Sequence, residues 1–155
     1  MPSTTLGYTQ RRLADYKKSL VLLDLTESSE QILAAARDMA AHSNAAMLVL
    51  HVVEFVPAEP MGETLMPTVQ IEEDLEERAK LKLSELSARL KLSRVSTRVE
   101  AGNKKTEILR IAKEEAVDLI VLGSRVRHGL SILVNFTEDT VLHAAHCDVL
   151  AVRLS

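Results

Sequence analysis

Short runs of aliphatic residues constrain the fold of this 155-residue chain more than any other feature. Three of them cover residues 19–25 (SLVLLDL), 46–53 (AMLVLHVV) and 117–122 (VDLIVL), and each is apolar along most of its length. A strand with one face in water alternates apolar and polar residues, whereas a strand covered on both faces does not. These runs therefore predict interior strands of a sheet that has helices on each face.

The segments between the runs carry helical periodicity, and Ser28 and Gln31 have the spacing of a capping box before the first helix. Three helices have their apolar positions within residues 32–40, 71–90 and 108–112, and a fourth helix is expected at 135–145. Two further strands are expected at 93–100 and 148–153. Five strands alternating with four helices predict an α/β three-layer sandwich. Its five-stranded sheet would be mainly parallel, in the order 3-2-1-4-5, with helices on both faces.

The chain is expected to form one domain. Residues 1–16 show no sustained period and predict a flexible N-terminal leader, so the folded domain would span residues 17–155. Residues 55–67 contain three of the four prolines and predict a long connection before the longest helix.

Composition excludes several classes of function. The net charge of -3 gives no general attraction to nucleic acid or to anionic membranes, and an aromatic content of 3% supplies few platforms for stacking bases. No apolar run approaches the roughly 20 residues that span a bilayer, and the polar N-terminus does not resemble a signal peptide. The single cysteine, Cys147, permits no intramolecular disulfide. We expect a cytoplasmic protein without nucleic-acid or membrane partners.

The predicted topology locates a candidate site. Ligands of open parallel sheets bind beyond the carboxyl ends of the strands, where the strand order reverses. The order 3-2-1-4-5 places this point between the first and fourth strands, next to Asp24 and Gly123. We expect the fourth strand to stop at Gly123 and to feed a loop into the last helix. The N-terminus of that helix, at residues 135–137, would direct its free N–H groups into the same crevice.

Taken in order, these motifs resemble those of the universal stress protein family over residues 19–154. The likeness rests on LLDLT at the end of the first strand, His51-Val52, Gly102, VDLIVLGSRVRHGLS from residue 117 and VLHAAHCDVLAVR from residue 141. The resemblance implies an adenine nucleotide alpha hydrolase-like fold.

The nucleotide-binding branch of that family carries Gly-x-x-Gly, eight or nine residues, and then Gly-Ser or Gly-Thr. Gly123 matches the first glycine, whereas Val126 replaces the second and Asn135 or Phe136 the third. Side chains at positions that need φ > 0 cost of order 1–3 kcal/mol each, so two replacements would weaken binding about a hundredfold or more. Leu22 also stands where nucleotide-binding relatives have a small residue.

The resemblance implies a dimeric, non-catalytic stress-response protein that does not retain ATP and has no resident cofactor. The alternative is a switch that binds ATP or AMP in a degenerate crevice, with weak or no hydrolysis. Arg125, Arg127 and His128 leave the loop cationic, so side chains there could hold an anion instead of the backbone. The residues of the candidate crevice are Asp24, Val52, Gly123, Ser124, Arg125, Arg127, Gly129, Asn135, Phe136 and Thr137.

The last strand, Asp148–Arg153, is expected at an edge of the sheet, where its apolar residues favour pairing with a second copy. Relatives commonly dimerise through this strand, so we expect a homodimer. The alternative is that the N-terminal leader covers the edge.

Two further chemistries have weak support in the sequence. His143, His146 and Cys147 carry zinc-binding groups, but no fourth ligand is evident and structural zinc needs four, so we expect no metal. Asp24, Asp118 and His51 suggest acid–base chemistry, yet the chain lacks G-x-S-x-G, P-loop and HExxH motifs. We expect no catalytic residues.

Overall fold

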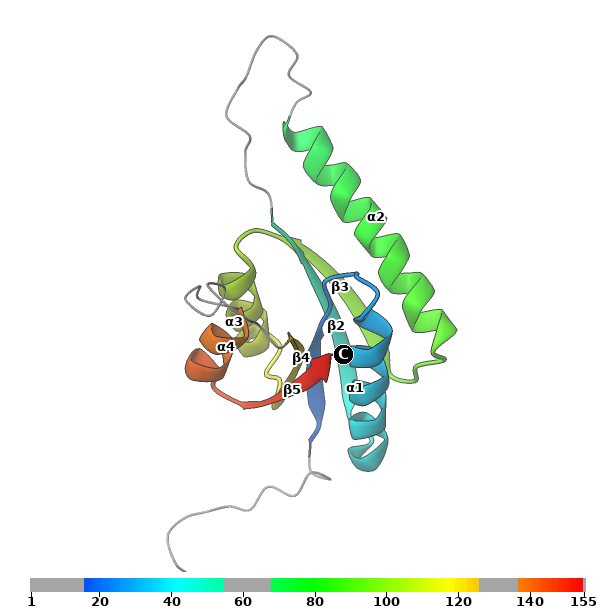
Figure 1. The fold of residues 1–155 in the computed structure, drawn as a ribbon, viewed down its shortest axis with the longest axis vertical. Coiled ribbons are helices and arrows are strands. Elements are labelled where there is room, and N and C mark those ends of the chain that lie inside the picture. Colours follow the sequence, from blue (N-terminus) through cyan, green and yellow to red (C-terminus); the bar gives the residue numbers. More distant parts are fainter. Residues whose placement is uncertain (1–15, 55–67, 126–136, 155) are drawn as a thin grey trace, which may run out of the picture.

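The computed structural model describes residues 16–54, 68–125 and 137–154, which form a sheet between two layers of helices (Figure 1). The strands are β1 (Lys18–Leu22), β2 (Ala46–Val53), β3 (Val95–Ala101), β4 (Leu119–Arg125) and β5 (Asp148–Leu154). The helices are α1 (Ser29–Ser43), α2 (Thr68–Arg89), α3 (Lys104–Glu114) and α4 (Thr137–Ala144).

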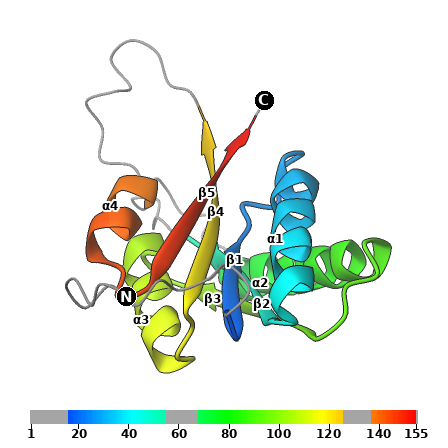
Figure 2. The same cartoon turned by 90° about the horizontal axis from the view of Figure 1, so that it is seen from below.

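The sheet has the order β3-β2-β1-β4-β5, and every neighbouring pair is parallel. This confirms the predicted α/β sandwich and the order 3-2-1-4-5. Helices α1 and α2 cover one face and α3 and α4 the other, as Figure 2 shows from below. In the described residues, no helix is long and apolar enough to cross a membrane.

Each face of the sheet has its own core, because successive side chains of a strand point to opposite faces. Val21, Val49 and Val121 pack with Leu33 of α1 and Leu83 of α2 on one face. The residues between them pack with α3 on the other face, where the core includes Leu20, Leu50, Ile108, Ile111 and Ile120. The continuous apolar runs of the sequence therefore supply two cores at once.

The N-terminus of α1 differs from the prediction. Ser28 is the N-cap residue, but its backbone is helical (φ -77°, ψ -8°) and its side chain does not cap the helix. A capping serine needs an extended backbone to turn its oxygen toward the free N–H groups, so the predicted capping box is wrong. By contrast, Asn103 caps α3 from an extended backbone and accepts a hydrogen bond from the Thr106 N–H.

Two strand ends also differ from the sequence prediction. β1 ends at Leu22, and the chain turns at Leu25, whose φ is 58°. β4 does not stop at Gly123: it continues to Arg125, with Gly123 opposite Val152 and Ser124 opposite Arg153 of β5. The extra pairing with β5 carries the fourth strand past its glycine.

Hydrogen bonds to the Asp118 carboxylate join the beginnings of β1 and β4. Its carboxylate accepts from the Lys17 N–H at 2.8 Å and the Lys18 N–H at 3.1 Å. Tyr16, the last residue of the expected leader, is buried, and its hydroxyl donates to Asp148 at the start of β5 at 2.8 Å. The first described residues thus lie against the two strands that form one side of the sheet.

Candidate functional site

Asp24 lies just beyond the carboxyl end of β1, at the point where the strand order reverses. β1 and β4 are neighbours, with Val21 opposite Val121, so Asp24 and Gly123 follow at the same edge of the sheet. The Asp24 carboxylate is exposed and forms an ion pair with Lys104 in the first turn of α3. Topology predicted this position for Asp24, whereas no sequence pattern indicated its lysine partner.

Gly123 lies within β4, and its missing side chain makes room for close packing. A Cβ at this position would lie 2.7 Å from Leu154 Cδ1 and 2.8 Å from Ile32 Cδ1. Such separations are shorter than van der Waals contact, so any side chain here would displace its neighbours. Residue 123 is therefore a glycine because α1 and β5 converge over it, and not because the chain turns there.

The remaining candidate residues divide into three groups. Val52 is buried on the α3 side of the sheet with Leu22 and Leu50, and Ser124 is partly buried in β4. Arg125 and Thr137 are described by backbone alone, as the last residue of β4 and the first of α4. The four others lie outside the described residues: Arg127, Gly129, Asn135 and Phe136.

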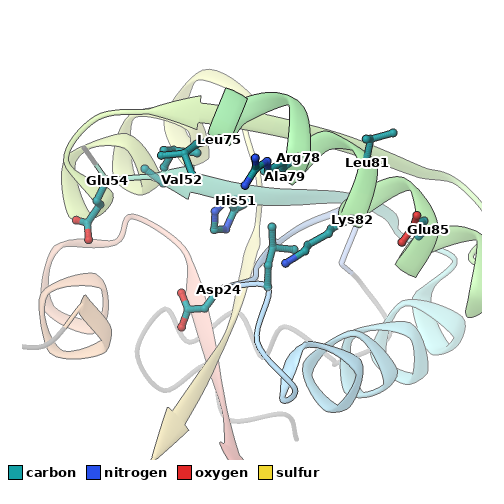
Figure 3. A pocket seen from close by; sticks show the side chains of 12 residues that line it. Asp24, His51, Val52, Glu54, Leu75, Arg78, Ala79, Leu81, Lys82 and Glu85 are labelled. Atoms are coloured by element: carbon teal, nitrogen blue, oxygen red, sulfur yellow. The ribbon is translucent and has the colours of Figure 1, made fainter. Parts of the chain in front are cut away.

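A pocket that sequence reasoning missed lies on the face of the sheet that α1 and α2 cover, between α2 and the ends of β1 and β2. The pocket is open to solvent and has a volume of about 770 Å³, and Figure 3 shows the side chains that line it. Its lining comprises Asp24, Leu25, His51, Val52, Val53, Glu54, Leu75, Arg78, Ala79, Leu81, Lys82 and Glu85. Two of its lining residues, Asp24 and Val52, were predicted as crevice residues, and His51 was a further signal as a polar residue within an otherwise apolar run.

The acid–base candidates bond to the backbone. His51 is partly buried, and its Nδ1 lies 2.7 Å from the Leu23 carbonyl oxygen, which can only accept a hydrogen bond. Asp118 accepts from the backbone of Lys17 and Lys18. Each contact accounts for its polar side chain by a hydrogen bond to the backbone of a neighbouring segment.

His143 and His146 are exposed near the end of α4, and Cys147 is partly buried. Within the described segments, no three or more His, Cys, Asp or Glu side chains form a group that could hold a metal ion.

Ion pairs perturb three groups on the side of the sheet nearest α3. Lys18 Nζ donates to Glu115 Oε2 at 2.5 Å, and this hydrogen bond lowers the pKa of the Glu115 carboxyl below its ordinary value. Hydrogen bonds to glutamates raise the pKa of the guanidinium groups of Arg98 and Arg110, which therefore stay charged. This network fastens α3 to β1 and β3 and lies outside the candidate crevice.

A five-stranded parallel sheet in this order, with helices on both faces and Asp24 at the point of reversal, defines an α/β protein of the adenine nucleotide alpha hydrolase-like class. The sequence model of the universal stress protein family matches residues 15–153, so the chain belongs to that family.

Similar proteins agree with this assignment. Universal stress protein A homolog 2 of Coxiella burnetii is 37% identical over 141 residues, which cover 90% of this chain and 97% of the relative. Homolog 1 of the same organism is 35% identical and covers 88% and 96%. Universal stress protein UspA from Lactobacillus plantarum has a similar structure, with a TM-score of 0.71, 23% identity and coverage of 90% and 99%. A universal stress protein solved in complex with cAMP has a TM-score of 0.62, 19% identity and coverage of 91% and 99%.

Proposed function

We propose that this chain is a non-catalytic stress-response protein that acts as a two-fold homodimer and does not retain ATP. Membership of the universal stress protein family supports the stress-response role. The observation that carries the loss of ATP is the packing at Gly123. The one motif glycine that the chain keeps has Leu154 and Ile32 against its bare Cα. Packing alone therefore accounts for this glycine, so its presence is no sign of a phosphate site.

The sequence of the loop supports the same proposal. Val126 stands where nucleotide-binding relatives have the second glycine, and Asn135 or Phe136 stands where they have the third. In those relatives the backbone N–H groups approach the phosphates, and a side chain would occupy the space of a phosphate oxygen. The Asp24 carboxylate, the other polar group at this edge, is already paired with Lys104.

Restoring the glycines tests this proposal directly. The double substitution Val126→Gly with Phe136→Gly rebuilds the spacing Gly-x-x-Gly, nine residues, Gly-Thr, with Thr137 supplying the hydroxyl. Calorimetric titration of the wild type with millimolar ATP or AMP should give no binding heat. The double variant should bind ATP about a hundredfold more tightly than the wild type. Nucleotide that copurifies with the wild-type protein would contradict the proposal.

The proposal that the protein is non-catalytic is tested by a separate measurement. His51 and Asp118 bond to the backbone, so neither is poised to activate water. We expect no phosphate release from ATP above the rate in buffer, for the wild type and the glycine-restored variant alike. ATP hydrolysis by the wild type that is lost in the Asp24→Asn variant would show that the protein is an ATPase.

A second candidate function is a switch that binds a nucleotide without hydrolysing it. The observation that favours it is the exposed Asp24 carboxylate at the reversal point, in a fold shared with a relative solved in complex with cAMP. Titration with ATP, AMP and cAMP would then give saturable binding that Asp24→Asn weakens.

A further inference from the structure

The pocket beneath α2 lies beside the nucleotide crevice of the fold and shares Asp24 and Val52 with it. His51 and Val53 alternate with Val52 along β2, so they point to the α2 face, whereas Val52 packs on the α3 face. The pocket extends from the end of β2 to α2, and it meets the crevice at Asp24 (Figure 3). Its volume of about 770 Å³ is within the range of small-molecule sites.

The walls of the pocket are aliphatic. Leu25 and Val53 line it on the strand side, and Leu75 and Ala79 line it on the helix side. Leu75 belongs to the same helical stripe as the buried Ala79 and Leu83, yet it is 39% exposed, because this part of α2 has the pocket beneath it. Among the described residues that line the pocket there is no Phe, Tyr or Trp, so these walls suit an aliphatic body better than a stacked ring.

Two cations of α2 stand together at the pocket. Arg78 and Lys82 are one helical turn apart and exposed, and neither forms an ion pair within the described part of the chain. Figure 3 shows both side chains extending from α2 toward His51. Like charges at this spacing destabilise a helix slightly, and an anion between them would remove that cost.

The carboxylates that line the pocket leave room for such an anion. Asp24 pairs with the Lys104 side chain, and Glu54 accepts from the Lys104 N–H at 3.0 Å. Both acids are therefore engaged by the start of α3. Glu85 is the third acid, and it lies at the end of the pocket away from Glu54 and Asp24 in Figure 3.

His51 adds a fixed polar group to the floor. Its Nδ1 donates to the Leu23 carbonyl, which holds the ring in place and leaves Nε2 for a ligand. Cations at the rim, aliphatic walls and one oriented imidazole together suit a molecule with an anionic head and an aliphatic tail.

We propose that the pocket beneath α2 binds a free aliphatic carboxylate of medium chain length. The tail lies between Leu75 and Ala79 of α2 and Val53 of β2, and the carboxylate lies between Arg78 and Lys82. This inference does not depend on whether the crevice near Gly123 binds a nucleotide.

Matched ligands test the charge and the tail separately. Calorimetric titration of the full chain with decanoate should give saturable binding. Decanol keeps the tail without the charge, decyltrimethylammonium reverses the charge, and acetate keeps the charge without the tail. We expect decanoate to bind at least fivefold more tightly than any of the three. Equal affinity for decanoate and decanol, or no saturable binding of decanoate, would overturn the proposal.

Substitutions that each remove one positive charge from α2 provide the matched variants. Arg78→Gln and Lys82→Gln should each weaken decanoate binding about fivefold, as expected for one partly exposed ion pair. Lys80→Gln is the control, because Lys80 is exposed on α2, lies outside this pocket and pairs with Glu76. Equal effects of all three substitutions would mean that only the net charge matters, and would overturn the site.

The position of the bound carboxylate can be measured independently of affinity. Amide chemical shifts of the wild type should change on adding decanoate at residues 51–54 and 75–85. Leu75→Gln should weaken binding, whereas Leu142→Gln, which alters an exposed leucine of α4, should not. Shift changes confined to β4 and β5 would place the ligand elsewhere and refute the proposal.

Discussion

At the scale of single residues, Gly123 permits a direct test of why glycine is kept. In Gly123→Ala the new methyl group would meet Leu154 Cδ1 at 2.7 Å and Ile32 Cδ1 at 2.8 Å. Both neighbours are ends of flexible side chains and can move at a cost of about 1–3 kcal/mol. Urea denaturation should therefore show a free energy of unfolding lower by about that amount.

The control for this substitution is a double-mutant cycle. Leu154→Ala removes the nearer of the two neighbours, so Gly123→Ala should cost less in that background than in the wild type. Equal costs in both backgrounds would show that Leu154 has no part in the requirement for glycine.

The ion pair between Glu115 and Lys18 leads us to expect that the stability of the protein depends on pH. The Lys18 ammonium lowers the pKa of the Glu115 carboxyl in the folded chain, so the unfolded chain binds the proton more readily. The ion pair therefore contributes fully above the ordinary glutamate pKa of about 4.3, and its contribution is lost as the pH falls through the lower folded value. In Glu115→Gln, stability should fall less steeply below about pH 4.3 than in the wild type.

Thermal unfolding at a series of pH values measures this difference. Glu77→Gln is a suitable control, since Glu77 is exposed on α2 and has no ion pair among the described residues. An acid profile that is identical for Glu115→Gln and the wild type would contradict the role given to Lys18.

The sequence predicted part of the candidate site at this scale. Asp24 and Gly123 could be located because topology alone brings the ends of β1 and β4 together. The pairing of Asp24 with Lys104 and the packing of Leu154 on Gly123 could not, because each depends on tertiary contacts between distant segments. The same holds for the pocket at His51, whose other wall comes from α2.

At the scale of elements, α2 is held to the sheet unevenly. Leu83 is fully buried, whereas Leu75, about two turns earlier on the same stripe, is 39% exposed. Leu83→Ala should therefore lower the free energy of unfolding by about 2–5 kcal/mol, and Leu75→Ala by less than about 1 kcal/mol. Urea denaturation of the two variants measures the contrast. Similar losses would mean that Leu75 is as well packed as Leu83.

The types of the elements and their order could be predicted from the sequence, because apolar runs and helical stripes of apolar residues indicate which residues are buried. Each strand and helix of the described residues overlaps the segment predicted for it, and β2 matches residues 46–53 at both ends. The end of β4 was missed, because glycine is typical of a strand end and the pairing of Ser124 and Arg125 with β5 has no local signal. The start of α1 was missed because Ser28 has suitable spacing but a helical backbone.

At the scale of the whole molecule, the order of the strands leaves β5 at an edge of the sheet (Figure 2). Its side chains are all partly or fully exposed, and they include Val149, Leu150 and Val152. We expect two copies to pair along this strand. Ala151→Lys places a charge in the middle of the seam at an exposed position and should convert the dimer to a monomer.

Sedimentation velocity at micromolar concentration distinguishes the two states. Ala144→Lys, at the exposed last residue of α4, adds the same charge away from the strand and should leave the dimer intact. A wild-type monomer under these conditions would rule out the homodimer.

The central position of β1 has a consequence for how the chain folds during synthesis. β1 pairs with β4 through Ser19 and Leu119, and the Lys18 N–H bonds to a carboxylate 100 residues further along the chain. A nascent chain that has reached α3 can assemble β3, β2 and β1, but β1 then has an unpaired apolar edge. β4 can pair with that edge only after it has left the ribosome. Until then the exposed edge favours aggregation with other chains, so protection of the nascent chain matters most between the synthesis of α3 and that of β4.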